Sequence, residues 1–353
     1  MTEKMTETLK ADPEYKEAGS AVLEVGEWSS RATLDIIGTA GMGHDFNAIQ
    51  NPNSELNVCY RTIFQPDRGA RMLQLIGILV PFWILAKIPS KRNQQIIDAR
   101  SLIRRVCFDL ISEKKEKMRE GKATGKDILS VAIESGGFSD EDLVNQLMTF
   151  LAAGHETTAS AMIWAAYLLC KHPDMQARLR EEVRTNLPAL TSDEPLTAAH
   201  FEKTPYLWAF CNEALRFDPP VALTLRIAAH DTTIQDQPIP KGTTVILCPW
   251  AVNTDKDQWG PDAHEFSPDR WLVAGKANTG GAESNYSLLT FLHGPRSCIG
   301  EKFARAEFAV LLATWVGRFQ MEFADKDYCL DIGGGVTSKP KGLKVRLTPL
   351  EGW

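Results

Sequence analysis

The chain has 353 residues, of which 44% are hydrophobic and 24% are charged, and its formal net charge at pH 7 is -6. This apolar fraction is close to that of ordinary globular proteins, so a sizeable core can form. No stretch combines dense Lys and Arg with aromatic residues, and nucleic acid is therefore not expected as a partner.

The cysteines indicate the redox environment. The chain has 7 of them, scattered without a C-x-x-C pair, and this pattern fits neither a disulfide framework nor a structural zinc site. We therefore expect a reducing compartment. The N-terminal residues are charged and lack the apolar run of a secretory signal peptide.

Helical periodicity dominates the chain. Apolar residues recur at three- and four-residue spacing in the stretches 34–46, 91–117, 127–134, 174–186, 205–217 and 301–318. Because this spacing places apolar side chains on one face of a helix, each stretch predicts a helix that packs against a core. The chain is therefore expected to be mainly α.

One uncharged segment allows three interpretations. Residues 72–86 carry no charge and are followed by Lys87-Ile-Pro89. The segment is shorter than the roughly 20 residues that a spanning helix needs. We interpret it as a buried helix broken at Pro81, and the alternatives are a shallow membrane contact through residues 72–88 and a helix that spans the membrane.

The longest predicted helix starts at Ser139-Asp-Glu-Asp142, a pattern that can cap a helix, and ends before Pro173. Residues 147–169 are apolar on nearly every face, so this helix should run through the centre of the protein. The main interruption is the polar cluster Gly154-His-Glu-Thr-Thr158. Burying such groups without partners costs several kcal/mol, so the cluster requires an explanation.

Strand patterns are few. Residues 227–234 and 243–247 read as two strands that flank Pro238-Ile-Pro-Lys-Gly242. They predict a minor β element. The irregular stretch 253–285 that follows is too long for a simple connection, so it should be well packed or functional.

A cysteine lies between two glycines just before a helix, in Phe291-Leu-His-Gly-Pro-Arg-Ser-Cys-Ile-Gly300. Backbone N–H groups and the positive end of the helix dipole can stabilise a thiolate at Cys298. Gly294 and Gly300 would let the backbone turn tightly and approach a flat ligand. Taken alone, a structural cysteine is the commoner outcome.

This ten-residue string resembles the haem-binding loop Phe-x-x-Gly-x-Arg-x-Cys-x-Gly of the cytochrome P450 family at every fixed position. The resemblance implies a mainly α, prism-like fold with a minor sheet, in a single domain over 1–353. It also implies haem b as cofactor, with the Cys298 thiolate as the axial iron ligand. Arg296 would pair with a haem propionate, and Phe291 would pack near the sulfur.

The cluster in the long helix is similar to the family's dioxygen-activating signature, which makes Thr157 a hydrogen-bond donor to dioxygen and Glu156 a relay for protons from solvent. Gly154 would open the helix groove for the oxygen. The residues of this cluster allow two other local interpretations. A zinc H-E-x-x-H site fails because residue 159 is Ala. The threonines could instead simply bond back to helical carbonyls.

A second part of the resemblance lies upstream of the cysteine. Glu213-Ala-Leu-Arg216 places two opposite charges on one helix face, and alone it would usually be a surface ion pair. It resembles the family's Glu-x-x-Arg helix, with Phe266-Ser-Pro-Asp-Arg270 as its later partner. This implies a buried triad of Glu213, Arg216 and Arg270.

Further positions follow from the same resemblance. Arg226 matches a family position that contacts the second propionate. Val221-Ala-Leu-Thr224 would line the substrate side of the haem, and its apolar character favours a hydrophobic small molecule. Lys302 and Arg305 lie where family members receive electrons that come from NADPH through a reductase.

The resemblance is to eukaryotic microsomal members of fungal type, begins at about Trp28, and implies that the N-terminal membrane anchor, first sheet and early helices are absent. The function expected is that of a monooxygenase of secondary metabolism at the cytoplasmic face of the endoplasmic reticulum, or soluble without its anchor. The alternatives are a catalytically inactive remnant, haem-binding or haem-free, and isomerase or dehydratase chemistry without external electrons.

Overall fold

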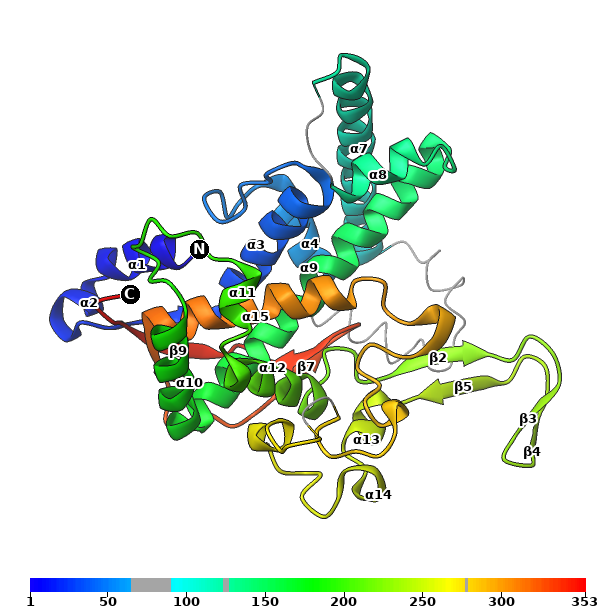
Figure 1. Ribbon diagram of the computed structural model, residues 1–353. Coiled ribbons are helices and arrows are strands. Elements are labelled where there is room, and N and C mark those ends of the chain that lie inside the picture. The colour runs from blue at the N-terminus through cyan, green and yellow to red at the C-terminus, as the bar shows by residue number, and fades with distance from the viewer. Residues whose placement is uncertain (65–89, 123–126, 277–278) are drawn as a thin grey trace.

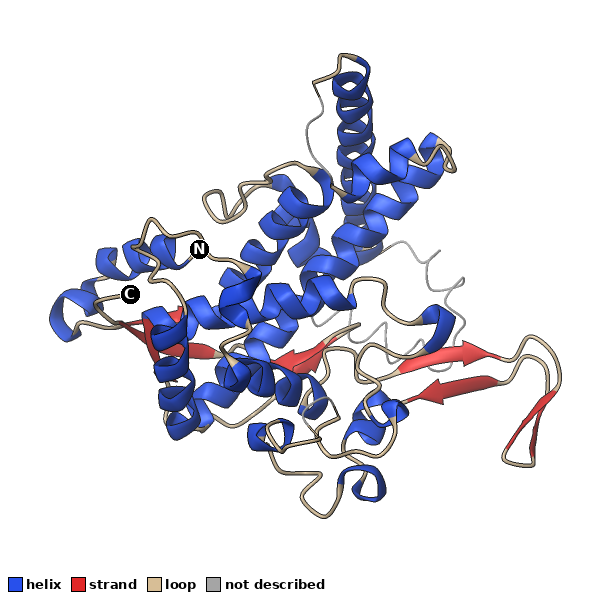
Figure 2. Ribbon diagram, in the orientation of Figure 1, coloured by secondary structure: helices blue, strands red, loops and turns tan. Residues whose placement is uncertain are grey.

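The computed structural model describes residues 1–64, 90–122, 127–276 and 279–353. Helices make up most of this structure, and the strands form small antiparallel sheets (Figure 2). The predicted fold class, mainly α with a minor β component, is therefore confirmed. The uncharged segment 72–86 and the membrane contact predicted for 72–88 lie outside the described residues. Within the described part, no helix is both long enough and apolar enough to cross a membrane.

The elements are named as in Figure 1. The helices are α1 (Thr2–Ala11), α2 (Pro13–Ala18), α3 (Val25–Ile37), α4 (Glu55–Phe64), α7 (Lys91–Arg119), α8 (Ile128–Glu134), α9 (Asp140–Lys171), α10 (Pro173–Asn186), α11 (Ala198–Phe201), α12 (Pro205–Phe217), α13 (Pro249–Asn253), α14 (Lys256–Trp259) and α15 (Glu301–Arg318). A π-helical turn, η1 (Gly38–Met42), and the short 3-10 turns η2 (Pro268–Trp271), η3 (Asn285–Ser287) and η4 (Gly294–Arg296) complete them. The strands are β1 (Ala21–Glu24), β2 (Thr224–Ile227), β3 (Thr232–Ile234), β4 (Gln237–Ile239), β5 (Thr244–Leu247), β6 (Phe319–Phe323), β7 (Ile332–Gly334), β8 (Ser338–Pro340) and β9 (Lys344–Pro349).

Helix α9 forms the centre of the molecule, as predicted. Its first turn is held by a capping box, in which the Ser139 hydroxyl accepts a hydrogen bond from the Asp142 N–H and the Asp142 carboxylate accepts one from the Ser139 N–H, each at 3.2 Å. Residues 158–166 are buried on all faces, which is typical of a helix inside a core. Helices α3, α7, α10, α12 and α15 all pack against α9, and Figure 1 shows α15 crossing it.

The predicted helix over 34–46 was wrong, whereas the other predicted helices match α7, α8, α10, α12 and α15. Helix α3 ends at Ile37 and changes into η1. The chain then folds back so closely that a Cβ on Gly38 would lie 2.5 Å from the Phe46 ring and 2.6 Å from the His44 carbonyl oxygen. The helix therefore stops where only glycine fits, despite the apolar residues beyond it.

The predicted strand over 227–234 was also wrong, because these residues belong to two strands. Strand β2 pairs with β5, close to the predicted 243–247, and β3 pairs with β4. Gln235 and Asp236 form the turn between β3 and β4 with φ values of 45° and 64°, as a tight two-residue hairpin turn requires. Pro238, which we had placed in a connection, lies in β4 opposite Thr233.

A three-stranded antiparallel sheet, in the order β1-β9-β6, was not predicted. It joins the two ends of the chain, since Ala21 in β1 lies opposite Leu347 in β9. Met5 and Leu9 of α1 are buried in the same hydrophobic core as Leu347 of β9. Figure 1 shows the two termini on the same side of the molecule. Residues before Trp28 are therefore an integral part of the fold.

Candidate functional site

A cavity of about 230 Å³ lies between α9, the end of α12 and the loop before α15. Most of the side chains around it are apolar, which suits an apolar or planar ligand. It is lined by Thr157, Thr158, Ala161, Leu215, Pro220, Val221, Thr224, Pro249, Thr290, Phe291, Leu292, Arg296, Cys298, Ala304 and Phe308. The structure thus brings Cys298, Arg296, Phe291 and Thr157 together around one space, although they come from distant parts of the chain.

The loop that carries Cys298 is held by its own backbone. The Cys298 N–H donates a hydrogen bond to the Phe291 carbonyl oxygen at 2.8 Å, and Leu292 and Gly294 have φ values of 58° and 78°. The thiol is exposed and lies two residues before Gly300, the N-cap of α15. A cysteine in this position is accessible, and its sulfur can reach a ligand in the cavity.

The two glycines of this loop have different roles. Gly294 has the positive φ that a tight turn needs, as we expected. Gly300 lies in the expected turn, which the Glu301 N–H closes by donating to the Cys298 carbonyl oxygen at 3.4 Å, but its φ of -90° does not require glycine. A Cβ on Gly300 would lie 3.9 Å from the Cys298 sulfur, so the hydrogen keeps the space beside the thiol open.

Arg296 and Arg226, the two arginines expected to pair with haem propionates, lie in different surroundings. Arg296 is exposed and lines the cavity. Arg226 is exposed on β2 and donates hydrogen bonds to the Thr224 hydroxyl at 3.2 Å and to the Leu225 carbonyl oxygen at 2.8 Å. Among the described residues it is Thr224, and not Arg226, that lines the cavity.

Helix α9 separates this cavity from a second one of about 270 Å³. Thr157 and Thr158 line the first cavity, and Glu156 lines the second. At 3.6 residues per turn these positions point to different sides of the helix. The Thr157 hydroxyl donates to the Ala153 carbonyl oxygen at 2.8 Å, which is the back-bonding alternative that the sequence had left open.

Glu156 is tied to strand β8 and to the residue before it. One of its carboxylate oxygens accepts hydrogen bonds from the Thr337 hydroxyl at 2.9 Å and from the Lys339 ammonium at 2.6 Å. The Glu156 side chain is 5% exposed and that of Lys339 is 18% exposed. Because the ion pair is largely buried, the Glu156 carboxylate is held on the side of α9 that faces the second cavity. Lys339 could not be predicted as a partner of Glu156 from the sequence, since the pairing depends on the long-range packing of β8 on α9.

The structure corrects the expectation for Gly154 and shows where the neighbouring His155 lies. Gly154 does not open a groove toward the Cys298 cavity: a Cβ there would lie 3.0 Å from the Ile37 side chain, so this glycine permits close packing of α3 on α9. His155 is buried, with Nδ1 3.0 Å from the Leu151 carbonyl oxygen and its ring against Tyr60. No group of three potential metal ligands of the His, Cys, Asp or Glu type exists among the described residues.

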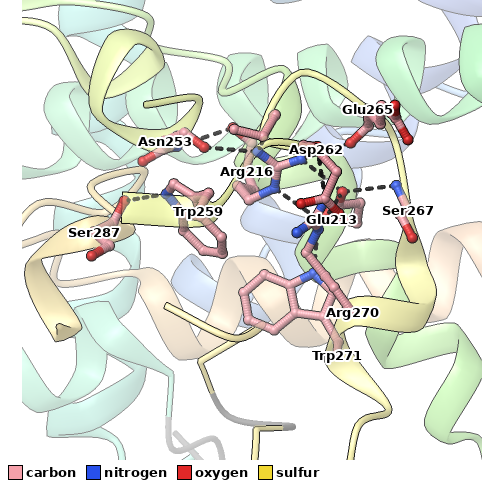
Figure 3. A network of polar contacts seen from close by, with 11 residues as sticks. Glu213, Arg216, Asn253, Trp259, Asp262, Glu265, Ser267, Arg270, Trp271 and Ser287 are labelled. Carbon is pink, nitrogen blue, oxygen red and sulfur yellow. Dashed lines mark hydrogen bonds and ion pairs between the residues drawn. The ribbon is translucent and has the colours of Figure 1, made fainter. Parts of the chain in front are cut away.

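The predicted triad of Glu213, Arg216 and Arg270 is confirmed (Figure 3). Arg216 donates to both Glu213 oxygens, at 2.7 and 2.8 Å, and Arg270 donates to one of them at 3.0 Å. The second Glu213 oxygen also accepts a bond from the Trp271 indole at 2.9 Å. Glu213 and Arg216 are both 0% exposed, so these two opposite charges compensate each other inside the core, while Arg270 also pairs with the partly exposed Asp262 at 3.0 Å.

This network also supports the cysteine loop. Arg216 donates to the Asn253 carbonyl oxygen at 2.8 Å. The Asn253 side chain accepts from the Leu289 N–H at 2.7 Å and donates to the Thr290 hydroxyl at 2.8 Å. Thr290 in turn donates to the Leu215 carbonyl oxygen at 2.8 Å. Asn253, the first residue of the irregular stretch, therefore fixes the residues that lead into the Cys298 loop.

The basic residues on α15 do not form one surface. Lys302 is exposed. Arg305 instead pairs with Glu301 at 2.9 Å, contacts the Asn212 side chain, and lies over the Phe291 ring at 4.8 Å. Arg305 is thus bound to the protein's own groups, and of the two only Lys302 is free to meet a partner.

One buried acid near the cavity was missed. Glu307 on α15 is 6% exposed, and neither of its oxygens has a hydrogen-bond partner among the described residues. The sequence offered a weak signal, because Glu307 interrupts the apolar face that Ala304, Phe308 and Leu311 form. A periodicity argument treats a single such residue as surface, since it does not show where the neighbouring helix lies.

Comparison with known proteins agrees with this geometry. The family model described as Cytochrome P450 matches residues 1–347. Cytochrome P450 monooxygenase sphH of Aspergillus fumigatus is 49% identical over 99% of this chain and 66% of its own length. Cytochrome P450 monooxygenases FUM15 of Gibberella moniliformis and ALT8 of Alternaria alternata are 44% and 42% identical, each over 94% of this chain and over 64% and 63% of their own lengths.

The chain therefore spans somewhat less than two thirds of the length of these fungal relatives. The family match begins at residue 1, so the expectation that the resemblance starts near Trp28 was wrong, as the packing of α1 and β1 also indicates. With the cysteine loop, the buried triad and the central helix in place, the chain belongs to the cytochrome P450 family.

Proposed function

We propose that the chain is a haem-thiolate monooxygenase that uses dioxygen to oxidise a hydrophobic small molecule. The observation that carries the proposal is the exposed Cys298 thiol, which opens into an apolar cavity closed on another side by Thr157 and Thr158 of α9. The printed names of the fungal relatives, all monooxygenases, support the same reaction class. We extend the proposal to secondary metabolism in a fungus on the same grounds.

The residues around the cavity suit haem b. Cys298 would supply the axial thiolate and Arg296 would meet a propionate, while Phe291 would pack near the sulfur. Arg226 would need to release its bonds to Thr224 and Leu225 before it could reach the second propionate. When bound, the haem supplies the binding and reductive activation of dioxygen.

The protein's own groups would position the substrate and protons. Val221, Leu215 and Phe308 give the cavity apolar walls, which favour a hydrophobic substrate. Thr157 would donate to dioxygen after its hydroxyl leaves the Ala153 carbonyl oxygen. Glu156 would take protons from the second cavity, which its Lys339 ion pair faces.

Electrons would come from NADPH through a reductase that docks near the start of α15, where Lys302 is exposed. A cation there can steer an acidic partner, so the rate of electron transfer should fall with salt. Lys302→Glu should slow haem reduction at low salt and have little effect at high salt. We also propose that residues 72–88 contact the endoplasmic reticulum membrane.

The test is the spectrum of the chain reconstituted with haem. Reduced under carbon monoxide, it should show the red-shifted Soret band of a thiolate ligand, and Cys298→Ser should lose that band completely. Cys329→Ser is the matched control, because Cys329 is also exposed and free but lies elsewhere. A chain that lacks the band, or keeps it in Cys298→Ser, contradicts the proposal. A thiolate band without substrate oxidation would favour the inactive alternative.

A further inference from the structure

Arg305 of α15 was expected to meet a redox partner, but three groups of the protein itself hold it. Its Nε donates to the Glu301 carboxylate at 2.9 Å, and its Nη1 donates to the side-chain oxygen of Asn212 on α12. The centre of its guanidinium group lies 4.8 Å from the centroid of the Phe291 ring. A cation at this distance attracts the face of an aromatic ring. Arg305 therefore joins α15, α12 and the loop that carries Cys298.

The position of Phe291 makes this contact relevant to Cys298. Phe291 packs against the main hydrophobic core, and it lines both the Cys298 cavity and a third cavity of about 160 Å³. Among the described residues, Arg305 lines the third cavity and not the first. Phe291 is thus part of the wall between two cavities, and without the cation its ring has free space into which it can move.

The backbone around Phe291 links the ring to the cysteine. The Phe291 carbonyl oxygen accepts the hydrogen bond from the Cys298 N–H at 2.8 Å, so a shift of Phe291 also shifts the loop at Cys298. The next residue, Leu292, has a φ of 58°. This left-handed conformation costs energy for a residue with a side chain, and it persists only where the surrounding contacts fix it. The contact with Arg305 adds a side-chain restraint at this strained turn.

We propose that Arg305 is a positioning residue that holds the Phe291 ring in the wall of the Cys298 cavity and keeps that part of the wall apolar. It acts through Phe291 and leaves contact with a redox partner to other residues. The inference deepens the proposed function, on which it rests for the role of the Cys298 sulfur as a haem ligand. The polarity around a cysteine ligand sets the reduction potential of its metal, so the ring that Arg305 holds contributes to that potential.

The first experiment measures access to the Cys298 thiol in the full chain before haem is added. Iodoacetamide alkylates the cysteines at one fixed pH, and peptide mass spectrometry gives the rate for each, with the exposed Cys329 as the reference in the same chain. Arg305→Leu should raise the Cys298 rate several-fold, while the buried Cys107 and Cys211 stay unreactive. An unchanged Cys298 rate overturns the inference. Reaction at the buried cysteines also overturns it, because Arg305 would then support the whole fold.

A double-mutant cycle tests whether the ring carries this effect. Phe291→Leu should also raise the Cys298 rate, and adding Arg305→Leu to it should cause no further rise, because the ring that the cation holds is then absent. Lys302→Leu is the matched control, since Lys302 is an exposed basic residue on the same helix and its loss removes the same charge. Independent rises in the double variant, or an equal rise in Lys302→Leu, overturn the inference.

The reconstituted chain gives a second readout and separates the two proposals. The reduction potential should become more positive in Arg305→Leu, because water enters the space that the ring leaves and stabilises the added negative charge of the reduced site. It should shift no further when Phe291→Leu is added. If the thiolate Soret band is missing from wild type, the proposed function fails, but the alkylation rates still test the contact. If the band is normal and the potential of Arg305→Leu is unchanged, the positioning role fails alone.

Discussion

Two buried acids on neighbouring helices show how similar residues take different roles. Glu213 of α12 is surrounded by Arg216, Arg270 and Trp271, and its charge is fully compensated. Glu307 of α15 is almost as buried, but neither of its carboxylate oxygens has a hydrogen-bond partner among the described residues. A satisfied ionic network rigidifies a structure, whereas an unsatisfied acid costs stability and suggests a function. The first acid holds the loop of Cys298, and the second lies beside its cavity.

The largest effect is expected from breaking the compensated network. Arg216→Met leaves the Glu213 carboxylate buried with fewer cations, and the free energy of unfolding should fall by about 3–5 kcal/mol. Chemical denaturation measures this change. Lys117→Met removes an exposed ion pair with Glu113 and should cost at most about 1 kcal/mol. Similar losses in both variants would contradict the distinction between buried and exposed pairs here.

The uncompensated acid should make stability depend on pH. The folded chain keeps the Glu307 proton up to about pH 8, whereas the unfolded chain releases it near the ordinary value of 4.5. Stability should therefore fall as the pH rises from about 4.5 to 8, by a few kcal/mol at roughly 1.4 kcal/mol per unit.

Unfolding of wild type and Glu307→Gln at pH 5 and pH 8 tests this prediction. Asp218, whose pKa burial raises to about 7, contributes a fall of the same sign in both proteins, so the difference between them isolates Glu307. Equal pH dependence in the two proteins would show that Glu307 does not hold a proton in the folded state.

A smaller loss of stability is expected at Glu156, because its partner Lys339 is partly exposed. Glu156→Gln leaves Lys339 without its carboxylate, and the unfolding free energy should fall by about 1–3 kcal/mol. Lys341→Met is the control on the same segment, because Lys341 and Asp331 are largely exposed, and it should change stability little. A neutral result for Glu156→Gln would mean that the pair is screened by water.

The smallest change in stability is expected at the N-terminal end of α9. Ser139→Ala removes the capping box of α9 and should lower stability by about 1 kcal/mol, as thermal denaturation can show. Ser101→Ala, at an exposed position inside α7, should instead leave stability unchanged or raise it slightly. Equal effects at both sites would argue against a role for the cap.

The failures of sequence interpretation have local physical causes. The helix over 34–46 failed because the close approach of His44 and Phe46 stops it at Gly38, which periodicity does not reveal. The strand over 227–234 failed because it is interrupted at residues 228–231, between β2, which pairs with β5, and β3, which pairs with β4. The reading of Gly154 failed because the space that this glycine leaves is filled by Ile37 from another helix.

The sequence by itself determined the mainly α class, the central helix with its cap, the Cys298 loop and the Glu213 triad, because these depend on local periodicity or on residues that match a family pattern at fixed spacing. Tertiary structure alone decided which side of α9 each polar residue faces. It pairs Glu156 with Lys339, and it buries Glu307 without a hydrogen-bond partner among the described residues. Both results depend on segments far apart in the chain, which only the packing of helices and strands on α9 brings together.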